Sequence, residues 1–287
     1  MSRIAYVNGR YQPHRGASVH IEDRGYQFAD GVYEVIAVFR GRLIDEEGHL
    51  VRLDRSLREL DIMWPVEPSV LPVLMREVVR RNRIENGIVY VQVTRGVARR
   101  DHAFPPGVRP ALVITARSQS LVHPAARTGV GVVTLPDIRW QRCDIKSVSL
   151  LPNVLAKQQA REMGAYEAWQ VDEDGFVTEG SSTNAWIVTK DGEIVTRDAS
   201  ESILNGITRL AVIRLAKDAQ MKIIERPFTV EEAMEASEAF LTSTTSFVLP
   251  IVSIDGEPVG DGKPGLVATR LRDFYVDYLD QVAAEAS

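Results

Sequence analysis

The sequence contains little cysteine, little lysine and no long apolar run. Cys143 is the only cysteine among 287 residues, which excludes an intrachain disulfide and a metal cluster built from cysteines. No window approaches a membrane span, and residues 1–8 lack the apolar stretch of a signal peptide. The formal net charge is -5, and no basic run suggests a nucleic-acid footprint. We therefore expect a cytoplasmic protein that binds neither nucleic acid nor membrane and holds no metal.

The bulk composition is typical of a folded protein with more than one domain. Hydrophobic residues make up 45% and charged residues 25% of the chain, which excludes a disordered protein. Its length is about twice the usual size of a single domain. The segment from Arg117 to Thr128 is polar and interrupted by Pro124, so we expect an interdomain linker at 119–128. This linker would join an N-terminal α+β domain at 1–118 to a C-terminal domain at 129–287.

Strand and helix patterns alternate along the first part of the chain. Asn8-Gly9 is a strong hairpin signal between two short strand-like runs. Four leucines between Leu50 and Leu60 recur at helical spacing, which predicts an amphipathic helix over 49–61. The other elements that we expect here are a helix over 68–83 and strands over 32–39, 87–94 and 111–116.

The second part of the chain shows the same mixture, so the expected fold class is α+β. Asp174-Gly175 and Asp191-Gly192 predict two hairpin turns. The remaining elements that we expect are a strand over 129–135 and helices over 151–163, 207–219 and 265–283. The sequence contains no internal repeat and no low-complexity segment.

Lys146 differs from the other lysines in its position. It lies between a strand and a helix, in Asp144-Ile145-Lys146-Ser147. A lysine at such a junction can be aimed into a cleft and desolvated, which favours the neutral amine and makes it a nucleophile toward a carbonyl. On this pattern alone, a surface lysine remains the ordinary interpretation. The other lysines are expected in turns or at solvent-facing positions on or after helices: Lys157, Lys190, Lys217, Lys222 and Lys263.

Three polar segments offer groups that could complete a site. The segment 178–184 contains Glu179, a carboxylate able to pair with a protonated ring nitrogen, although a polar hairpin connection explains it too. The segment 205–209 opens a helix, where backbone N–H groups and a hydroxyl suit a phosphate, although an ordinary helix cap has the same pattern. The hydroxyls of 242–246 could bind the same anion. Together these groups suit a phosphorylated pyridine that carries an aldehyde.

The same motifs, in this order, are shared with a known family. The chain resembles the fold-type IV pyridoxal-phosphate transaminases, and most closely the D-amino acid transaminases. The resemblance runs from about Arg24 to Gly262 and includes the segments 23–34, 144–147, 179–182, 206–209 and 242–246. It implies a two-domain fold, with a smaller N-terminal α/β domain and a larger β-barrel-like C-terminal domain with helices. It also implies pyridoxal 5'-phosphate as the cofactor.

The resemblance implies a role for individual residues. Lys146 resembles the lysine that forms a Schiff base with the cofactor and later moves the proton at the substrate Cα. Glu179 is similar to the partner of the pyridine nitrogen, and Arg52 resembles the arginine that binds the phosphate. The further cofactor contacts that it implies are Leu204, Ile207, Thr208, Ser243 and Thr244.

Substrate recognition is expected from one tyrosine and an Arg-x-His pair. In the D-amino acid branch such residues hold the α-carboxylate, and here they correspond to Tyr33, Arg100 and His102. The family's loop reaches into the neighbouring active site, which implies a homodimer that acts on amino acids and 2-oxo acids. A basic turn whose charges face water is the alternative interpretation of this loop.

Other activities of the same fold stay open at this point. A branched-chain L-amino acid transaminase or an (R)-selective amine transaminase would usually do without the Arg-x-His pair, so Arg100 and His102 argue against both. An aminodeoxychorismate lyase shares the lysine and the cofactor, and the sequence discriminates it poorly. A cofactor-binding protein without turnover would have lost Lys146 or Glu179, and both are present. Trp186 and 247–249 are more apolar than expected of close relatives, and we expect them in the core.

Overall fold

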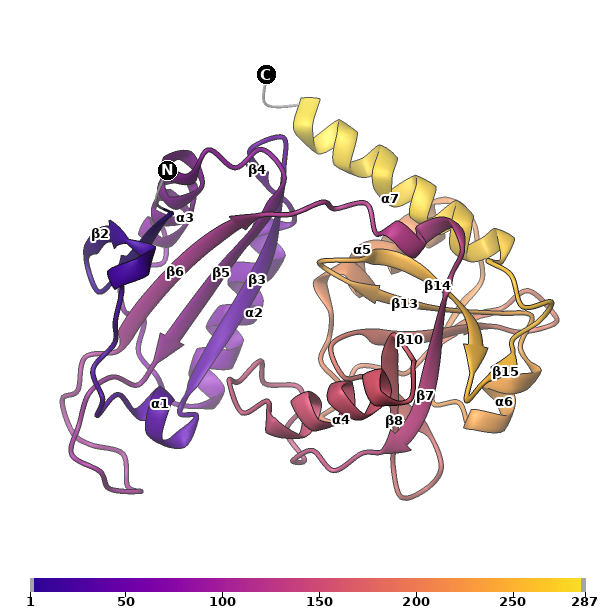
Figure 1. Cartoon of the computed structure of the whole chain (residues 1–287), viewed down its shortest axis with the longest axis horizontal. Helices are drawn as coiled ribbons and strands as arrows, with labels where there is room; N and C mark the ends of the chain where they lie inside the picture. Colours follow the sequence, from indigo (N-terminus) through magenta and orange to yellow (C-terminus); the bar gives the residue numbers. More distant parts are fainter. Residues whose placement is uncertain (1–2, 285–287) are drawn as a thin grey trace. The chain divides into compact units, whose positions relative to one another are not determined.

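The chain folds into two compact units. The computed structural model describes residues 3–284, so the outer ends of both expected domains lie partly outside it. Within these residues, the first unit comprises the chain up to Leu121 together with Ile145–Ser149, and the second comprises Val122–Asp144 and the chain from Leu150 onward (Figure 1). The division after Leu121 falls inside the segment 119–128, whose role as a linker stays a prediction. Within the described residues, no helix is both long and apolar enough to cross a membrane.

The first unit is built on a six-stranded sheet in the order β2-β1-β6-β5-β3-β4. Every neighbouring pair in this sheet is antiparallel. The strands are β1 (Ile4–Val7), β2 (Arg10–Pro13), β3 (Gly31–Phe39), β4 (Arg42–Leu43), β5 (Gly87–Thr94) and β6 (Ala111–Ser118). β1 and β2 form the hairpin predicted at Asn8-Gly9, where both residues have positive φ.

Two longer helices pack against this sheet. α2 (Glu46–Glu59) begins three residues before the expected start and has Glu46 and Glu47 in its first turn, where acidic groups stabilise the helix dipole. α3 (Val70–Asn82) packs into the same apolar cluster as α2 and β5. The short helix α1 (Arg24–Phe28) is not indicated by the sequence pattern. Asp23 caps it by accepting a 2.8 Å hydrogen bond from the backbone N–H of Gly25.

A short segment far along the chain, Ile145–Ser149, belongs to the first unit. Ser147 forms an antiparallel bridge with Val32 of β3, and Ile145 is buried in the apolar cluster under the sheet. The sequence-based division placed these residues in the C-terminal domain. That placement differs from the structure because the chain returns to β3 before continuing into the second unit.

The second unit is built on a curled nine-stranded sheet in the order β12-β11-β10-β13-β14-β7-β8-β9, with β15 paired to β14 (Figure 1). β7 pairs in parallel with both β14 and β8. The strands are β7 (Val130–Pro136), β8 (Glu167–Val171), β9 (Val177–Gly180), β10 (Asn184–Val188), β11 (Ile194–Thr196), β12 (Ile223–Glu225), β13 (Glu238–Ser243), β14 (Phe247–Ile254) and β15 (Glu257–Pro258). The two hairpins predicted at Asp174-Gly175 and Asp191-Gly192 are confirmed.

Helices complete the second unit, and the α+β fold class is confirmed. They are α4 (Leu151–Glu162), α5 (Ile207–Asp218), α6 (Val230–Glu235) and α7 (Leu266–Ala284), together with a 3-10 turn at Pro124–Arg127. Trp186 is fully buried and stacks on Phe240 with ring centres 5.3 Å apart. Phe247, Val248 and Leu249 are also buried, so the expected core role of these apolar residues is confirmed.

Candidate active site

Lys146 is held beside β3 by its backbone. Its carbonyl accepts a 3.0 Å hydrogen bond from the N–H of Tyr33, and its own N–H donates to the Ser56 hydroxyl of α2 at 3.3 Å. The Nζ atom lies 4.4 Å from the centre of the Tyr33 ring, which stacks in turn on Tyr90. Lys146 is therefore a half-buried amine fixed against an aromatic face, which separates it from a freely moving surface lysine.

Arg52 belongs to a buried ionic cluster in the first unit. Its Nε and Nη2 atoms both donate to the Glu34 carboxylate at 2.8 Å, and the His49 Nδ1 atom lies 2.7 Å from the same carboxylate. Burial acts to raise the pKa of Glu34, but Arg52 and His49 outweigh it and hold that pKa at about 2. Burial lowers the pKa of His49. The ionised Glu34 thus fixes the Arg52 guanidinium in a bidentate geometry.

Tyr33, Arg100 and His102 all lie in the first unit. Tyr33 is half-buried on β3, whereas Arg100 and His102 are exposed on the loop between β5 and β6. Both loop residues contact one ring: the guanidinium carbon of Arg100 lies 5.0 Å from the centre of Phe28, and the His102 ring centre lies 5.3 Å from it. The structure therefore gathers the Arg-x-His pair on one aromatic side chain.

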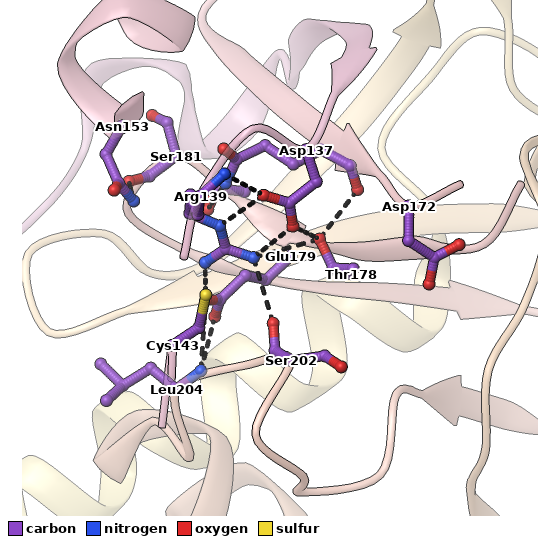
Figure 2. Close-up of polar contacts among 12 residues, drawn as sticks. Asp137, Arg139, Cys143, Asn153, Asp172, Thr178, Glu179, Ser181, Ser202 and Leu204 are labelled. Atoms are coloured by element: carbon purple, nitrogen blue, oxygen red, sulfur yellow. Dashed lines mark hydrogen bonds and ion pairs between the residues drawn. The ribbon is translucent and has the colours of Figure 1, made fainter. Parts of the chain in front are cut away.

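Glu179 lies at the centre of a polar network in the second unit (Figure 2). It is 6% exposed and is ion-paired with Arg139. It also accepts a 3.0 Å hydrogen bond from the side-chain amide of Asn184, and bonds of 3.1 and 3.2 Å from the backbone N–H of Leu204. Leu204, expected as a cofactor contact, is thus placed against the carboxylate through its backbone. A buried carboxylate with these donors suits a role in binding a cation, and a simple hairpin connection does not require them.

Arg139 connects Glu179 to a second carboxylate, that of Asp137 (Figure 2). Burial acts to lower the pKa of Arg139, but Glu179 and Asp137 raise it, so the guanidinium stays charged. Burial likewise acts to raise the pKa of Asp137, and the hydrogen bonds from Arg139 and Thr178 hold it below its ordinary value. Burial raises the pKa of the nearby Cys143 thiol to about 12, so this cysteine is a poor nucleophile near neutral pH.

The N-terminus of α5 presents backbone donors in the second unit. The helix begins at Ile207 with Gly206 as its N-cap, and no side chain of the described residues caps it there. A Cβ atom at Gly206 would lie 2.1 Å from the Asn184 Oδ1 atom, so only glycine fits without movement. Ile207 and Thr208 are both buried. This end of α5 therefore has the N–H groups and dipole that favour an anion.

The hydroxyl-rich segment forms the turn between β13 and β14. Ser243 Oγ lies 3.3 Å from Thr245 Oγ1 and accepts a 3.2 Å hydrogen bond from the N–H of Ser246, whereas Thr244 is half-buried in the same turn. Thr242 differs from these residues, because its hydroxyl accepts a bond from the buried Trp186 indole at 2.9 Å. Ser243 and Thr244 thus lie together in the turn, whereas the Thr242 hydroxyl is hydrogen-bonded within the buried core.

Sequence reasoning misplaced one lysine and missed several partners. Lys157 was expected to face solvent, but its amine donates to the Tyr166 carbonyl and lies 3.4 Å from the fully buried carboxylate of Glu167. That correction follows from the packing of α4 on β8, which no local pattern shows. Glu34, Arg139 and Asn184 were not assigned roles. The one available signal for the Glu34 cluster was a pair of polar residues, His49 and Arg52, on the apolar face of α2.

Comparisons with known proteins identify the family of the chain. The model of the family "Amino-transferase class IV" matches residues 31–254. The D-alanine aminotransferase of Staphylococcus aureus (strain MSSA476) is 43% identical over 278 residues, which cover 96% of this chain and 97% of that protein. The D-alanine aminotransferase of Bacillus licheniformis is 42% identical over 260 residues, 90% of each chain. The chain belongs to the class IV aminotransferases.

Solved structures show the same fold. The T.th. branched-chain amino acid aminotransferase with pyridoxamine 5'-phosphate matches with a TM-score of 0.90 and 28% identity, over 97% of this chain and 94% of that chain. The Escherichia coli branched-chain amino acid aminotransferase also matches with a TM-score of 0.90, at 24% identity over 96% of this chain and 94% of that chain, and shows the likeness of fold alone. Among the described residues, no group of three or more His, Cys, Asp or Glu could hold a metal ion.

Proposed function

We propose that the protein is a pyridoxal-phosphate-dependent transaminase for D-amino acids. It would exchange the amino group of a substrate such as D-alanine or D-glutamate with a 2-oxo acid such as pyruvate or 2-oxoglutarate. The observation that carries the substrate class is the 43% identity to a D-alanine aminotransferase over 96% of the chain. The exposed Arg100 and His102 support it, because a guanidinium and an imidazole suit an α-carboxylate.

Both units contain residues that fit pyridoxal 5'-phosphate. Glu179 is a buried carboxylate held by Arg139, Asn184 and Leu204, which suits a protonated pyridine nitrogen. The uncapped N-terminus of α5 supplies donors for a phosphate from Ile207 and Thr208. The further phosphate contacts that we propose are Arg52, Ser243 and Thr244. When bound, this cofactor withdraws electrons from the substrate Cα and so makes its hydrogen acidic.

The amine of Lys146 has two proposed tasks. It would bind the cofactor covalently at rest, and after the substrate amine takes its place it would move the proton at the substrate Cα. The contacts of Lys146 with Tyr33 and Ser56 support this role, since they fix its backbone and leave a half-buried amine beside Tyr33. Glu179 would hold the proton on the ring nitrogen, and the ion pair with Arg139 would keep the Glu179 carboxylate in place for that purpose.

The proposed substrate contacts come from Tyr33, Arg100 and His102. We propose a homodimer in which the loop of one copy supplies Arg100 and His102 to the site of the other. The exposure of both residues supports this arrangement, because they are accessible to a second copy. A cytoplasmic location is also part of the proposal.

Reduction with borohydride tests the role of Lys146. The purified protein with pyridoxal 5'-phosphate should be yellow, and borohydride should fix a phosphopyridoxyl group on Lys146, which peptide mapping would identify. The exposed Lys217 provides a matched control, since Lys217→Ala should label like the wild type and Lys146→Ala should not label. A label on any other lysine would show that the assignment is wrong.

A coupled assay tests the substrate class against its alternatives. D-alanine, D-glutamate and L-leucine are each paired with a 2-oxo acid, and the two D-amino acids should be the better donors. Preference for L-leucine would favour a branched-chain transaminase. Absence of amino transfer from all three donors would favour a lyase, which eliminates pyruvate from a substrate that carries an enolpyruvyl group and does not exchange amino groups.

A further inference from the structure

The loop that carries Arg100 and His102 is long and has no regular structure of its own. Residues 95–110 connect β5 to β6 without a helix or a strand, apart from one bridge between Val97 and Asp23. Ordering such a loop when a substrate arrives would reduce the affinity. The groups that fix the loop beforehand therefore bear on substrate binding.

Arg24 holds the main chain of this loop. The Arg24 side chain is 3% exposed, and its Nη1 atom donates to the carbonyl of Asp101 at 2.5 Å. Its Nη2 atom lies 3.4 Å from the carbonyl of His102, and its backbone N–H donates to the carbonyl of Gly96 at 2.9 Å. Arg24 thus contacts the loop at its start and at the two successive carbonyls of Asp101 and His102.

Asp30 fixes Arg24 in this position. Its Oδ2 atom pairs at 2.7 Å with the Nε atom of Arg24 and at 2.7 Å with the Nε atom of Arg95, so two guanidiniums share one carboxylate. Arg95 also donates to the carbonyls of Leu60 and Asp61, at 2.6 and 2.8 Å, just beyond the end of α2. Asp30 therefore links the loop to the helix that carries Arg52.

Phe28 contacts the side chains of this loop, whereas Arg24 binds its backbone. The guanidinium carbons of Arg24 and Arg100 lie 4.8 and 5.0 Å from the centre of the Phe28 ring, and the His102 ring centre lies 5.3 Å from it. A π face attracts cations at this range. One half-buried ring thus contacts both members of the Arg-x-His pair.

We propose that Arg24, Asp30 and Phe28 are positioning residues that hold Arg100 and His102 ready for the carboxylate of the substrate. This inference rests on the proposed function, which assigns the carboxylate to that pair. It also accounts for the polar and aromatic residues of the segment 23–30. Within this segment Asp23 caps α1, Arg24 binds the backbone of the loop, and Phe28 contacts its side chains. The preorganised loop lowers the entropy lost on binding without touching the reacting atoms.

Phe28→Leu is the first test, because it removes the aromatic face and keeps an apolar side chain. The KM for D-alanine should rise roughly 3- to 30-fold, the range expected for the loss of one or two cation–π contacts. The kcat should stay within about twofold, since the carboxylate is bound in both the ground state and the transition state. Arg24→Lys should raise the KM as well, because an ammonium cannot bond Asp30 and two carbonyls in the same planar geometry.

Arg99→Ala is the matched control. Arg99 is exposed in the same loop, and its loss removes a positive charge next to Arg100 without changing Arg24, Asp30 or Phe28. It should leave the KM for D-alanine unchanged within about twofold. If Arg99→Ala raised the KM as much as Phe28→Leu, a general sensitivity of the loop to substitution and not the positioning by Phe28 would explain the effect, and the proposal would be overturned.

Hydrogen–deuterium exchange of residues 95–103 gives a readout that does not depend on activity, because the backbone N–H groups of Arg95 and Ala98 donate to the carbonyls of Asp30 and Glu22, and that of Ala103 donates to the Asp101 carboxylate. The exchange of these three amides should be faster in Phe28→Leu and Arg24→Lys than in the wild type, and unchanged in Arg99→Ala. Wild-type exchange and wild-type KM in both positioning variants would overturn the proposal, and Phe28→Leu keeps this test open should Arg24→Lys fail to fold. If the wild type transaminated no D-amino acid while the exchange pattern held, the proposed function would fail and the loop anchor would stand.

Discussion

The side-chain amide of Asn184 donates a 3.0 Å hydrogen bond to the carboxylate of Glu179. The same amide nitrogen donates to the carbonyl of Leu204 at 2.9 Å, and the amide oxygen lies where a Cβ atom on Gly206 would have to go. Asn184 therefore connects two parts of the second unit: the proposed partner of the ring nitrogen and the proposed phosphate-binding end of α5.

Gly206→Ala tests this connection. The backbone at Gly206, with φ -65° and ψ 136°, suits any residue, so the conflict is with the Asn184 side chain alone. Forcing that side chain aside should destabilise the protein by about 1–3 kcal/mol and weaken the binding of pyridoxal 5'-phosphate. Urea denaturation and equilibrium dialysis measure the two effects.

The control for Gly206→Ala is Gly16→Ala. A Cβ atom on Gly16 would meet no heavy atom within 4 Å, so this variant should resemble the wild type in both measurements. Wild-type cofactor affinity in Gly206→Ala would show that Asn184 moves without disturbing Glu179 or α5.

Glu179→Gln tests the electronic role of the buried carboxylate. The variant should keep the cofactor but transaminate much more slowly, because a neutral amide cannot hold the ring nitrogen protonated. We expect a loss of about 2–5 kcal/mol of transition-state stabilisation, measured as kcat/KM for D-alanine. Glu193→Gln, at a surface pair with Lys222, should leave the rate unchanged. Unchanged turnover in Glu179→Gln would reduce Glu179 to a structural partner of Arg139.

The Glu34 cluster predicts a loss of stability in acid. The Glu34 pKa of about 2 lies below its ordinary value of 4.5, so the cluster stabilises the fold above about pH 4.5, and this contribution is lost as the pH falls toward 2. His49 acts in the same direction, because burial lowers its pKa and the unfolded chain takes up the proton first below about pH 6.5. For Glu34 the contribution at neutral pH is on the order of 3 kcal/mol.

Urea denaturation of Glu34→Gln between pH 7 and pH 3 measures this contribution. The variant should be less stable at pH 7, and it should lose less stability than the wild type on acidification. Glu77→Gln is the matched control: the pKa of Glu77 is also about 2, lowered by hydrogen bonds from Arg80 and Arg81, but these arginines are 71% and 41% exposed and water screens them. An equal effect of both substitutions would contradict the cluster's role.

The sequence predicts helices, strands and hairpins well where the hydrophobic periodicity and the turn residues determine them. The strand over 87–94 is found as β5 (Gly87–Thr94), and both hairpins of the second unit turn at Asp-Gly pairs. A role could also be proposed for motif residues such as Glu179, because the family resemblance gives their order. The partner Arg139 could not be assigned, because it reaches Glu179 from forty positions away through tertiary structure.

Contacts between residues that are far apart in the sequence could not be predicted for the same reason. Glu34 and Arg52 are eighteen positions apart, and only the packing of α2 on β3 brings them together. The return of Ile145–Ser149 to the first unit depends on the free edge of β3 beyond the two-residue strand β4, which no local pattern indicates. Lys157 was assigned to solvent because a helical pattern does not reveal the buried Glu167 beside it.

Substitution of Arg100 tests the proposed choice of substrate most directly. If Arg100 and His102 bind the α-carboxylate, Arg100→Ala should lower kcat/KM for D-amino acids by about ten- to a hundredfold, mainly through KM. The protein's stability should hardly change, because the Arg100 side chain is exposed. Steady-state kinetics with D-alanine and thermal denaturation measure the two quantities.

Three comparisons decide whether the loss of Arg100 reflects carboxylate binding. Arg100→Lys should recover only part of the activity, because an ammonium cannot form the planar two-point contact. Any activity on (R)-1-phenylethylamine should be nearly unaffected by Arg100→Ala, since this amine has no carboxylate. The preference of the enzyme between D- and L-amino acids gives an independent check. A carboxylate held on one side of the cofactor determines which enantiomer presents its Cα hydrogen to Lys146. A wild-type preference for L-leucine over D-alanine would refute the assignment and favour the branched-chain activity.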